Sequence, residues 1–386
     1  MKKVMMGTEA AALAAVMARV QVVAAYPITP QTVTVEELSD YIGSGRLKAE
    51  FLTVESEHSA MAACVAASAT GARAFTATSS QGLALMHEML HYASSGRLPI
   101  VMLNANRALA TPWNLYCDHT DALSQRDTGW VQYYCADVQD VMDSTLIAYK
   151  VAESTMVPVM INLDGFYLTH TSEIVDVPDQ EAVDRFLPAF QPECKVDVEA
   201  PSTFGAVCGA DLYMSLKYRR QKDTLGVEKV WSEVAEDFAA RFERRHPVLD
   251  PYRMDHAEVA LVVLGTASGT ARLAADALRL EGVAAGALRL SMFRPFPKQA
   301  IVSALGGVRH VVVIDRDVSI GAEGIVAQEI KACLYGRHHA HVHGFIAGIG
   351  GVDVTVDMLR GIVKQALGGQ ETAIALNESY WVEVLP

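Results

Sequence analysis

The feature that most constrains the fold is a repeated alternation of short apolar runs with segments of helical spacing. In the first part of the chain the apolar runs lie at 22–26, 51–54, 73–78, 99–104 and 157–163, and the helical segments at 57–71, 81–94 and 142–154. A strand that is covered on both faces is apolar along its whole length, and parallel strands need helical crossovers. This part of the chain is therefore predicted to form a parallel sheet with helices on both faces.

The alternation stops near residue 165 and resumes at residue 256. The segment between them is rich in proline and ends in a charged stretch of helical spacing at about 211–245. Beyond it, strands are expected at 259–264, 287–292, 310–315 and 341–346, and helices at 268–280, 298–305, 322–335 and 354–367. We expect an α/β protein with two parallel-sheet domains: residues 1–250, with a helical excursion at about 165–250, and residues 256–386.

Composition and charge exclude several classes of function. About half of the residues are apolar, but no apolar run reaches the roughly 18–20 residues that a membrane-spanning helix needs. The net charge of −13 predicts an acidic surface that repels phosphate backbones, so no nucleic-acid partner is expected. Residues 1–9 are basic, but an alanine-rich amphipathic stretch follows them, which we interpret as the first helix and not as a signal peptide.

The cysteines argue against a metal centre in this chain. None of the six forms a C-x-x-C pair, so the sequence offers no case for an iron–sulfur cluster or a zinc site. Single, scattered cysteines are typical of reduced thiols, most of them buried. A cytoplasmic location and no bound metal are expected.

Three loops follow predicted strands and deserve a functional interpretation, because ligands of open α/β sheets bind at the carboxyl ends of the strands. They are 27–32, 55–58 and 104–121. In the first, two prolines restrict the backbone and present the Thr29 hydroxyl rigidly. The simpler interpretation is a turn in which Thr32 caps the next helix.

The second loop contains Glu55, Glu57 and His58 at the start of a predicted helix. Carboxylates at this position are stabilised by the helix dipole, and capping alone explains them. The functional interpretation is a carboxylate that shares a proton with a heteroaromatic nitrogen, which is the group that thiamine diphosphate requires.

The third loop is long and polar, with aromatic residues interspersed. Arg107 offers a planar guanidinium that suits a carboxylate ligand. Alternatively, Arg107 pairs with Asp118 or Asp121 to hold the loop together.

Several of these segments together resemble one known family. Residues 26–32, 56–59, 78–83, 106–121 and 126–130 resemble, in order and spacing, motifs of the alpha subunit of the pyruvate and 2-oxoacid:ferredoxin oxidoreductases. In the second half, residues 293–297, 315–316 and 348–351 resemble further motifs of that family. The resemblance implies a pyrimidine-binding thiamine enzyme domain followed by a domain like the carboxy-terminal domain of transketolase.

The resemblance also implies roles for particular residues. Glu57 corresponds to the glutamate that contacts the aminopyrimidine, and Thr29 and Arg107 to the residues that bind the 2-oxoacid. The remaining site residues it implies are a cofactor-side turn, Ser79, Ser80 and Gln81, and a substrate loop with Asn114, Asp118, Trp113 and Tyr116.

The sequence lacks part of what such an enzyme needs. Thiamine enzymes hold Mg²⁺ and the diphosphate with a Gly-Asp-Gly turn and a later Asn, and that turn is absent here. The resemblance implies that a beta subunit supplies the diphosphate and Mg²⁺ site and a cluster, and that further subunits carry more iron–sulfur clusters. The implied reaction converts a 2-oxoacid and coenzyme A to acyl-coenzyme A and CO₂, with electrons passing to ferredoxin or another acceptor.

The expected substrate is of the pyruvate type, and both the substrate and the reaction class have alternatives. The aromatic side chains of Trp113 and Tyr116 suggest an oxoacid larger than pyruvate, either branched or an aryl acid such as phenylglyoxylate. Val352 stands where the family usually has Arg, which puts a role for that position in doubt. A non-oxidative thiamine enzyme half and a non-catalytic scaffold subunit are the alternatives of other classes.

Three other patterns have simpler explanations. The glycines at 321–324 and 348–351 predict tight turns more than nucleotide binding. The histidines at 338–343 could chelate a metal, but no carboxylate or cysteine completes a set nearby. The basic run 217–222 is typical of a solvated helix face or a subunit contact.

Overall fold

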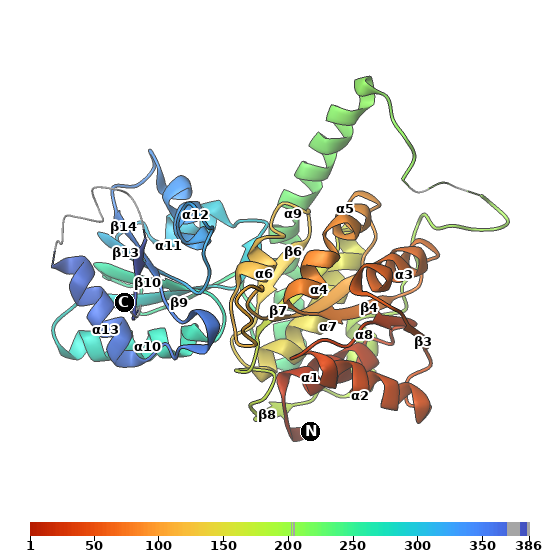
Figure 1. Ribbon diagram of the computed structural model, residues 1–386, viewed down its shortest axis with the longest axis horizontal. Helices are drawn as coiled ribbons and strands as arrows, with labels where there is room; N and C mark the ends of the chain where they lie inside the picture. Colours follow the sequence, from red (N-terminus) through yellow and green to blue (C-terminus); the bar gives the residue numbers. More distant parts are fainter. Residues whose placement is uncertain (202, 204, 369–378, 384–386) are drawn as a thin grey trace.

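The computed structural model describes residues 1–201, 203, 205–368 and 379–383, which form two lobes, each built on one sheet (Figure 1). In the first lobe the sheet runs in the order β12 (Met292–Arg294), β6 (Val131–Tyr134), β7 (Val159–Asp164), β5 (Val101–Asn106), β4 (Ala74–Thr78), β2 (Val22–Ala25) and β3 (Glu50–Thr53). All neighbours in it are parallel except β12 and β6. The predicted parallel sheet of the first half is confirmed.

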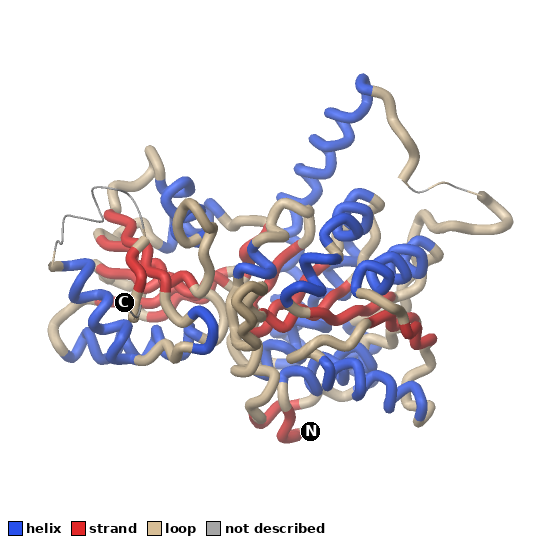
Figure 2. Tube along the Cα trace, viewed as in Figure 1, coloured by secondary structure: helices blue, strands red, loops and turns tan. Residues whose placement is uncertain are grey.

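Helices cover both faces of this sheet (Figure 2). One face carries α1 (Gly7–Met17), α2 (Thr32–Gly43), α7 (Val138–Thr155) and α8 (Gln180–Phe186), and the other carries α3 (Glu57–Ala69), α4 (Ser80–Leu85), α5 (His87–Ser95) and α6 (Thr120–Leu123). The first helix differs from its prediction as amphipathic. Its alanines are buried on nearly all sides because small side chains let α2 and α7 pack closely against it.

The second lobe has a sheet in the order β15 (Tyr380–Trp381), β14 (His341–Ile346), β13 (His310–Asp315), β10 (Val259–Val263), β11 (Ala285–Leu290) and β9 (Leu249–Tyr252). Only β9 is antiparallel to its neighbour. Figure 1 shows α11 (Lys298–Ala304) and α12 (Ile325–Leu334) on one face, and α10 (Ala267–Leu280) and α13 (Val356–Leu367) on the other. The α/β class with two mainly parallel sheets is confirmed.

Some strands were not predicted. The short ribbon of β1 (Lys2–Met5) and β8 (Glu173–Asp176), and the strands β6, β9 and β12, were missed because each is short and contains a polar or charged residue, so none forms a continuous apolar run. Two of them lie at lobe junctions. β12 belongs to the second half of the sequence but pairs with β6 of the first sheet, and β9 adds an edge to the second sheet. The domain boundary at 250–256 stays a prediction.

The predicted helical excursion is the long helix α9 (Ala210–Phe242). Its second half packs on α7 through Val227, Trp231, Val234 and Phe238, and the Trp231 ring stacks on Tyr133 with ring centroids 4.5 Å apart. Its first half contains no buried residue and projects from the body (Figure 1). No helix among the described residues is both long enough and apolar enough to cross a bilayer.

Beyond α9, a buried histidine is held between two carboxylates of α7. His246 Nδ1 lies 2.8 Å from Asp140 Oδ1, and its Nε2 lies 3.0 Å from Asp143 Oδ2. Burial opposes the charged imidazole, but the two carboxylates outweigh burial and raise the pKa of His246 from 6.5 to about 9. The imidazolium therefore stabilises the fold below pH 6.5, and this contribution disappears as the pH rises through 9.

Replacing His246 by Gln is expected to cost on the order of 3 kcal/mol of unfolding free energy at pH 6 and much less at pH 10, as the rise in pKa implies. Urea denaturation at the two pH values measures this. His339→Gln, at an exposed histidine, is the control and should change neither value. An equal loss at both pH values would contradict a charged His246.

Candidate active site

The loops that follow β2, β3, β4 and β5 meet at one edge of the first sheet, because these strands are parallel and adjacent. Each loop contributes a residue that the sequence analysis selected. Thr29 follows β2, Glu57 follows β3, Gln81 follows β4 and Arg107 follows β5. The roles of these residues stay predictions.

Arg107 joins three of these loops. Its Nη1 donates to the Thr29 carbonyl oxygen at 2.6 Å, and its Nη2 donates to Gln81 Oε1 at 2.7 Å. Nε is buried without a partner in the described part of the chain. Burial lowers the pKa of Arg107, although the negative charges of Asp121 and Glu57 act to raise it. The guanidinium is therefore anchored at one end and has a free donor at Nε.

Among the described residues, the Arg107 guanidinium makes no hydrogen bond or ion pair with Asp118 or Asp121, which was the alternative interpretation. Asp121 instead accepts from the backbone N–H of Arg107 at 3.1 Å, from the backbone N–H of Ser80 at 3.0 Å, and from Asn106 Nδ2 at 2.8 Å. Burial raises the pKa of Asp121 to about 6. Asp121 therefore ties the β4 turn to the β5 loop.

Asp121 was not selected as a site residue, although its loop was. Its organising role depends on Ser80, which lies far away in the sequence, so no local pattern identifies it. Two asparagines at the end of β5, Asn104 and Asn106, were the available signal, because buried amides need acceptors.

Asp121→Asn is expected to lower the unfolding free energy by about 1–3 kcal/mol and to reduce kcat/KM, because an amide leaves part of this donor set without an acceptor. Thermal denaturation and steady-state kinetics of the assembled enzyme measure the two effects. Asp255→Asn, at an exposed aspartate, is the matched control. Unchanged unfolding free energy and unchanged kcat/KM would show that Asp121 does not organise the site.

Glu57 lies at the first position of α3, after the capping residue Ser56. It is 7% exposed, and the turn into α4 passes close to it: a Cβ added to Gly82 would lie 2.6 Å from Glu57 Oε1 and 2.5 Å from Thr78 Oγ1. Glycine at position 82 is therefore what allows a carboxylate to occupy this space.

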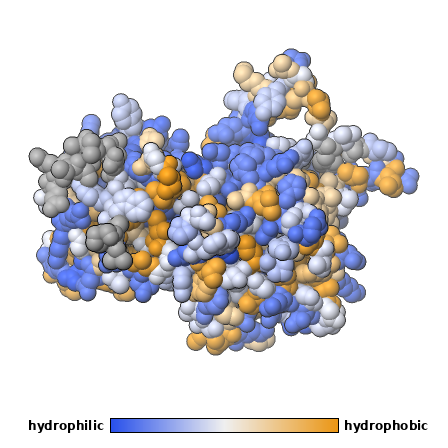
Figure 3. All heavy atoms as spheres, in the orientation of Figure 1, coloured by the Kyte–Doolittle hydropathy of each residue, from blue (hydrophilic) through white to orange (hydrophobic). Residues whose placement is uncertain are grey.

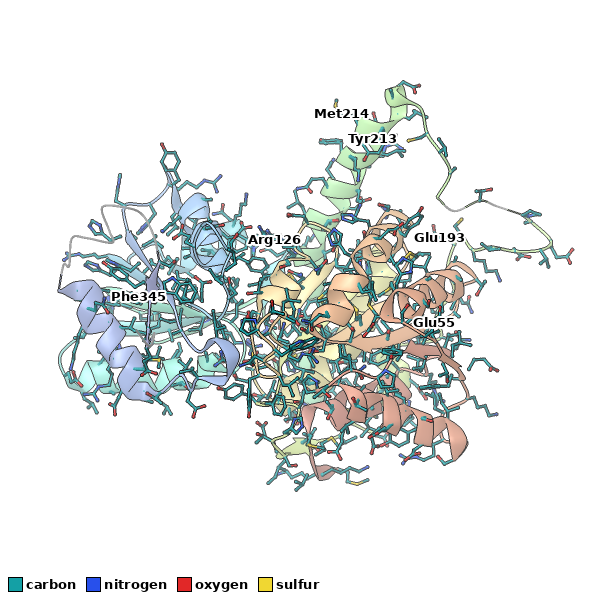
Figure 4. All side chains as sticks on the ribbon, in the orientation of Figure 1. Glu55, Arg126, Glu193, Tyr213, Met214 and Phe345 are labelled. Carbon is teal, nitrogen blue, oxygen red and sulfur yellow. The ribbon has the colours of Figure 1, made fainter. Side chains whose placement is uncertain are left out.

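The two neighbouring candidates have different surroundings. Glu55, labelled in Figure 4, accepts a hydrogen bond from Ser59 Oγ at 2.7 Å, which lowers the pKa of this exposed carboxyl. His58 Nε2 lies 3.5 Å from Glu88 on the surface. Glu55 therefore lies on the surface before the capping residue, whereas Glu57 points into the protein.

Unpartnered polar atoms surround this region. In the described chain, Thr78 Oγ1, Ser79 Oγ, Gln81 Nε2 and Arg107 Nε are buried and make no hydrogen bond. Buried polar groups normally have partners, so this group of donors and acceptors fits a polar ligand. Ser80 differs, because its hydroxyl donates to the Ala108 carbonyl at 2.6 Å and is already used within the chain.

The four residues of the expected substrate loop contact the second lobe, their own loop or solvent. Asn114 Nδ2 donates to the Gly350 carbonyl at 3.0 Å, and the Tyr116 ring lies against Gly351 of the second lobe. Asp118 accepts from the N–H of Thr120, and Trp113 is exposed. No hydrogen bond in the described part of the chain joins any of the four to Thr29, Glu57 or Arg107.

The glycine-rich turn of the second lobe receives this loop. Gly348, Gly350 and Gly351 all have positive φ, of 78°, 70° and 96°, which supports the interpretation as a tight turn. Gly350 N–H donates to the Cys117 carbonyl at 2.9 Å. The next residues also contact the first lobe, since Tyr167 donates to Asp353 Oδ1 at 3.1 Å.

One cluster has the composition of a metal site: Cys117, His119 and Asp164 offer ligand atoms within 4.8 Å of one another. However, Arg316 Nη1 donates to Asp164 Oδ2 at 2.8 Å, and His119 Nε2 lies 2.8 Å from Asp164 Oδ1. Burial raises the pKa of Cys117, which keeps it a thiol. A fixed cation already neutralises the carboxylate, so the cluster acts as an ionic link between the lobes.

Comparison with known proteins adds the family. The model described as pyruvate flavodoxin/ferredoxin oxidoreductase, thiamine diphosphate-binding, matches residues 13–236, and the model for pyruvate:ferredoxin oxidoreductase core domain II matches residues 257–359. Ketoisovalerate oxidoreductase subunit VorA of Pyrococcus horikoshii is 46% identical over 94% of this chain and 93% of its own length. Pyruvate synthase subunit PorA of Methanocaldococcus jannaschii is 45% identical over 94% of both chains.

Solved structures agree at the level of the fold. The 2-oxoglutarate:ferredoxin oxidoreductase from Magnetococcus marinus superposes with a TM-score of 0.72 at 18% identity, covering 95% of this chain and 65% of that chain. A split-gene transketolase has a TM-score of 0.56 at 15% identity over 94% of this chain and 98% of that one. By its sequence matches, the chain belongs to the pyruvate:ferredoxin oxidoreductase family of thiamine diphosphate-dependent 2-oxoacid oxidoreductases, as its motifs indicated.

Proposed function

We propose that this chain is the alpha subunit of a coenzyme A-acylating 2-oxoacid oxidoreductase and that it binds the aminopyrimidine side of thiamine diphosphate. The observation that carries the proposal is the gathering of Glu57, Gln81 and Arg107 with unpartnered buried polar atoms at one sheet edge. The names of the relatives, pyruvate synthase and ketoisovalerate oxidoreductase subunits, support the reaction class.

The reaction converts a 2-oxoacid and coenzyme A into acyl-coenzyme A and CO₂, and two electrons leave for ferredoxin or another acceptor. Thiamine diphosphate, when bound, supplies the carbanion that makes loss of CO₂ possible. The Gly-Asp-Gly turn for Mg²⁺ and cysteines spaced for a cluster are absent from the sequence. We therefore assign the diphosphate and Mg²⁺ site to a beta subunit, and the iron–sulfur clusters to that subunit and further ones.

Within this chain, Glu57 holds a proton at a ring nitrogen of the cofactor. Its nearly buried carboxylate lies against Gly82, where the missing side chain leaves the room that the carboxylate occupies. Gln81 Nε2 and Ser79 Oγ are the nearby groups without partners that can bond to the polar edge of such a ring. A carboxylate within hydrogen-bond reach of a ring nitrogen can act on it as a general acid or base.

Thr29 and Arg107 orient the substrate. The Thr29 carbonyl is occupied by Arg107, while the exposed Thr29 side chain remains available for a substrate oxygen. Arg107 carries the positive charge of the site, and a 2-oxoacid carboxylate is its natural partner. Both residues therefore orient the oxoacid without taking part in bond cleavage.

The substrate is proposed to be of the pyruvate type, with a branched or aryl oxoacid as the alternative. Relatives named for pyruvate and for ketoisovalerate are almost equally similar to this chain. The contact of Tyr116 with Gly351 gives that ring a structural role, which weakens the case for an aryl substrate. A higher kcat/KM for phenylglyoxylate than for pyruvate would make the aryl oxoacid the favoured substrate.

The deciding experiment is purification of the native complex, followed by measurement of bound thiamine diphosphate, of iron, and of viologen reduction with a panel of 2-oxoacids. We expect the cofactor, iron and oxoacid-dependent dye reduction together. A complex with thiamine but without iron or dye reduction would identify a non-oxidative enzyme, and a complex without thiamine would leave a scaffold role.

A further inference from the structure

The first half of α9, residues 210–226, is a projecting helix that we call the arm. None of its residues is buried, and its large apolar side chains are exposed, with Met214 80% and Tyr218 64% accessible. Figure 3 shows apolar atoms gathered over its free end, and Figure 4 places Tyr213 and Met214 there and Arg126 beside its root. The arm is about 25 Å long at 1.5 Å per residue.

Only the root of the arm is held by its own chain, because Arg220 donates to Ser95 Oγ at 2.8 Å and Asp223 pairs with Arg97. Isolated helices of about 12–15 residues are marginal in water, and most helical stability comes from packing of an apolar face. Soluble proteins seldom expose contiguous apolar patches without a partner or ligand that covers them. The arm therefore needs a covering surface in the working protein.

One face of the arm continues into a cleft at its root. Tyr213, Lys217, Gln221 and Leu225 recur every four residues and so lie along one face of the helix. The last three line a cleft of about 400 Å³ at the root of the arm. Tyr213 continues the same stripe one turn beyond the cleft. The arm and the cleft thus form a single surface.

This surface is basic on an acidic protein. The cleft is lined by five cationic side chains and two carboxylates, namely Arg126, Lys217, Arg220, Arg294 and Lys298, with Asp127 and Glu329. One of the cations is neutralised, because Arg294 pairs with Glu329. Arg220 and Arg126 donate to neutral groups and keep their charge.

The remaining positive charge comes from three elements. Lys217 belongs to the arm, Arg126 follows α6, and Lys298 begins α11 of the second lobe. Both lysines are exposed. The chain as a whole carries a net charge of −13, so this concentration of cations is local.

We propose that the arm and the cleft at its root dock an acidic, partly apolar segment of a different subunit of the assembled oxidoreductase. A second copy of this chain is a poorer occupant, because a two-fold interface would bring this basic surface against an identical basic surface. A small phosphate compound would fill the cleft but leave Tyr213 and Met214 uncovered. This inference rests on the proposal that the chain works beside other subunits.

The first test uses the complex with its partner subunits and measures assembly, not turnover. In the double variant Lys217→Glu with Lys298→Glu, the affinity of this chain for the rest of the complex is expected to fall at least tenfold, because like charges then face each other. Lys229→Glu, at an exposed lysine on the packed half of the same helix, is the control and should assemble normally. Normal assembly of the double variant would overturn the proposal.

The second test identifies the occupant. A photoreactive benzoylphenylalanine in place of Tyr213 is expected to cross-link to an acidic peptide of another subunit in the intact complex. A cross-link to a second copy of this chain, or no cross-link, overturns the proposal. Failure of the proposed function is distinguishable, because it would appear as an assembled, cross-linked complex that contains no thiamine diphosphate.

Discussion

Replacing Glu57 by Gln is expected to lower kcat of the assembled enzyme by about 10²–10⁴-fold, the usual contribution of a positioned acid–base group. The amide has the size of the carboxylate and fits the same space beside Gly82, so the fold should be retained. What is lost is the ability to hold and release a proton at the cofactor ring. Steady-state dye reduction at saturating oxoacid measures the effect.

The matched control is Glu55→Gln, two residues away. Glu55 is exposed and hydrogen-bonded to Ser59, so its substitution should leave turnover within about twofold, as is usual for surface positions. Binding of thiamine diphosphate, measured by calorimetry, provides a second readout that does not depend on turnover. Equal activity of both variants would support a non-catalytic scaffold.

Replacing Arg107 by Ala is expected to lower kcat/KM by on the order of 10²-fold, through loss of a charge-assisted contact with the substrate carboxylate. Two local contacts, with the Thr29 carbonyl and Gln81 Oε1, disappear as well. The substitution therefore removes a contact with the substrate and two contacts that position the loops, and both losses lower kcat/KM.

The two components can be separated. Arg107→Lys retains the charge but not the planar fork, so it should recover part of the affinity for the oxoacid. Added guanidinium should restore activity to Arg107→Ala if the cation itself is what the substrate needs. Arg19→Ala, at an exposed ion pair with Asp184, is the control. Unchanged kinetics of Arg107→Ala would remove this residue from the site.

Local patterns predicted much of the architecture. Strands buried on both faces are apolar along their length, so β4, β5, β7, β10 and β13 could be recognised without neighbours. Short strands that contain a polar or charged residue could not. β6 contains the polar Gln132, whose amide bonds to the Ala122 carbonyl, and β12 has only three residues. β6 and β12 pair with each other although they lie more than a hundred positions apart in the chain.

Local patterns also identified some residues of the candidate site and missed others. Thr29, Glu57 and Arg107 were found because each follows a predicted strand, and parallel strands bring their carboxyl ends to one edge. The role of Asp121 was not found, because it depends on the backbone of Ser80, which is distant in sequence, as well as on the backbone of Arg107 in the same loop. The position of the substrate loop against the second lobe was equally beyond local patterns.

By itself, the sequence determined the α/β class, the main strands and the loops that carry polar residues, because hydrophobic periodicity and turn chemistry are local properties of the chain. Only the tertiary structure decided which loops touch, that Glu57 points inward while Glu55 faces solvent, and that half of α9 has no covering surface. These properties follow from sheet order and packing, which join residues that no spacing along the chain relates.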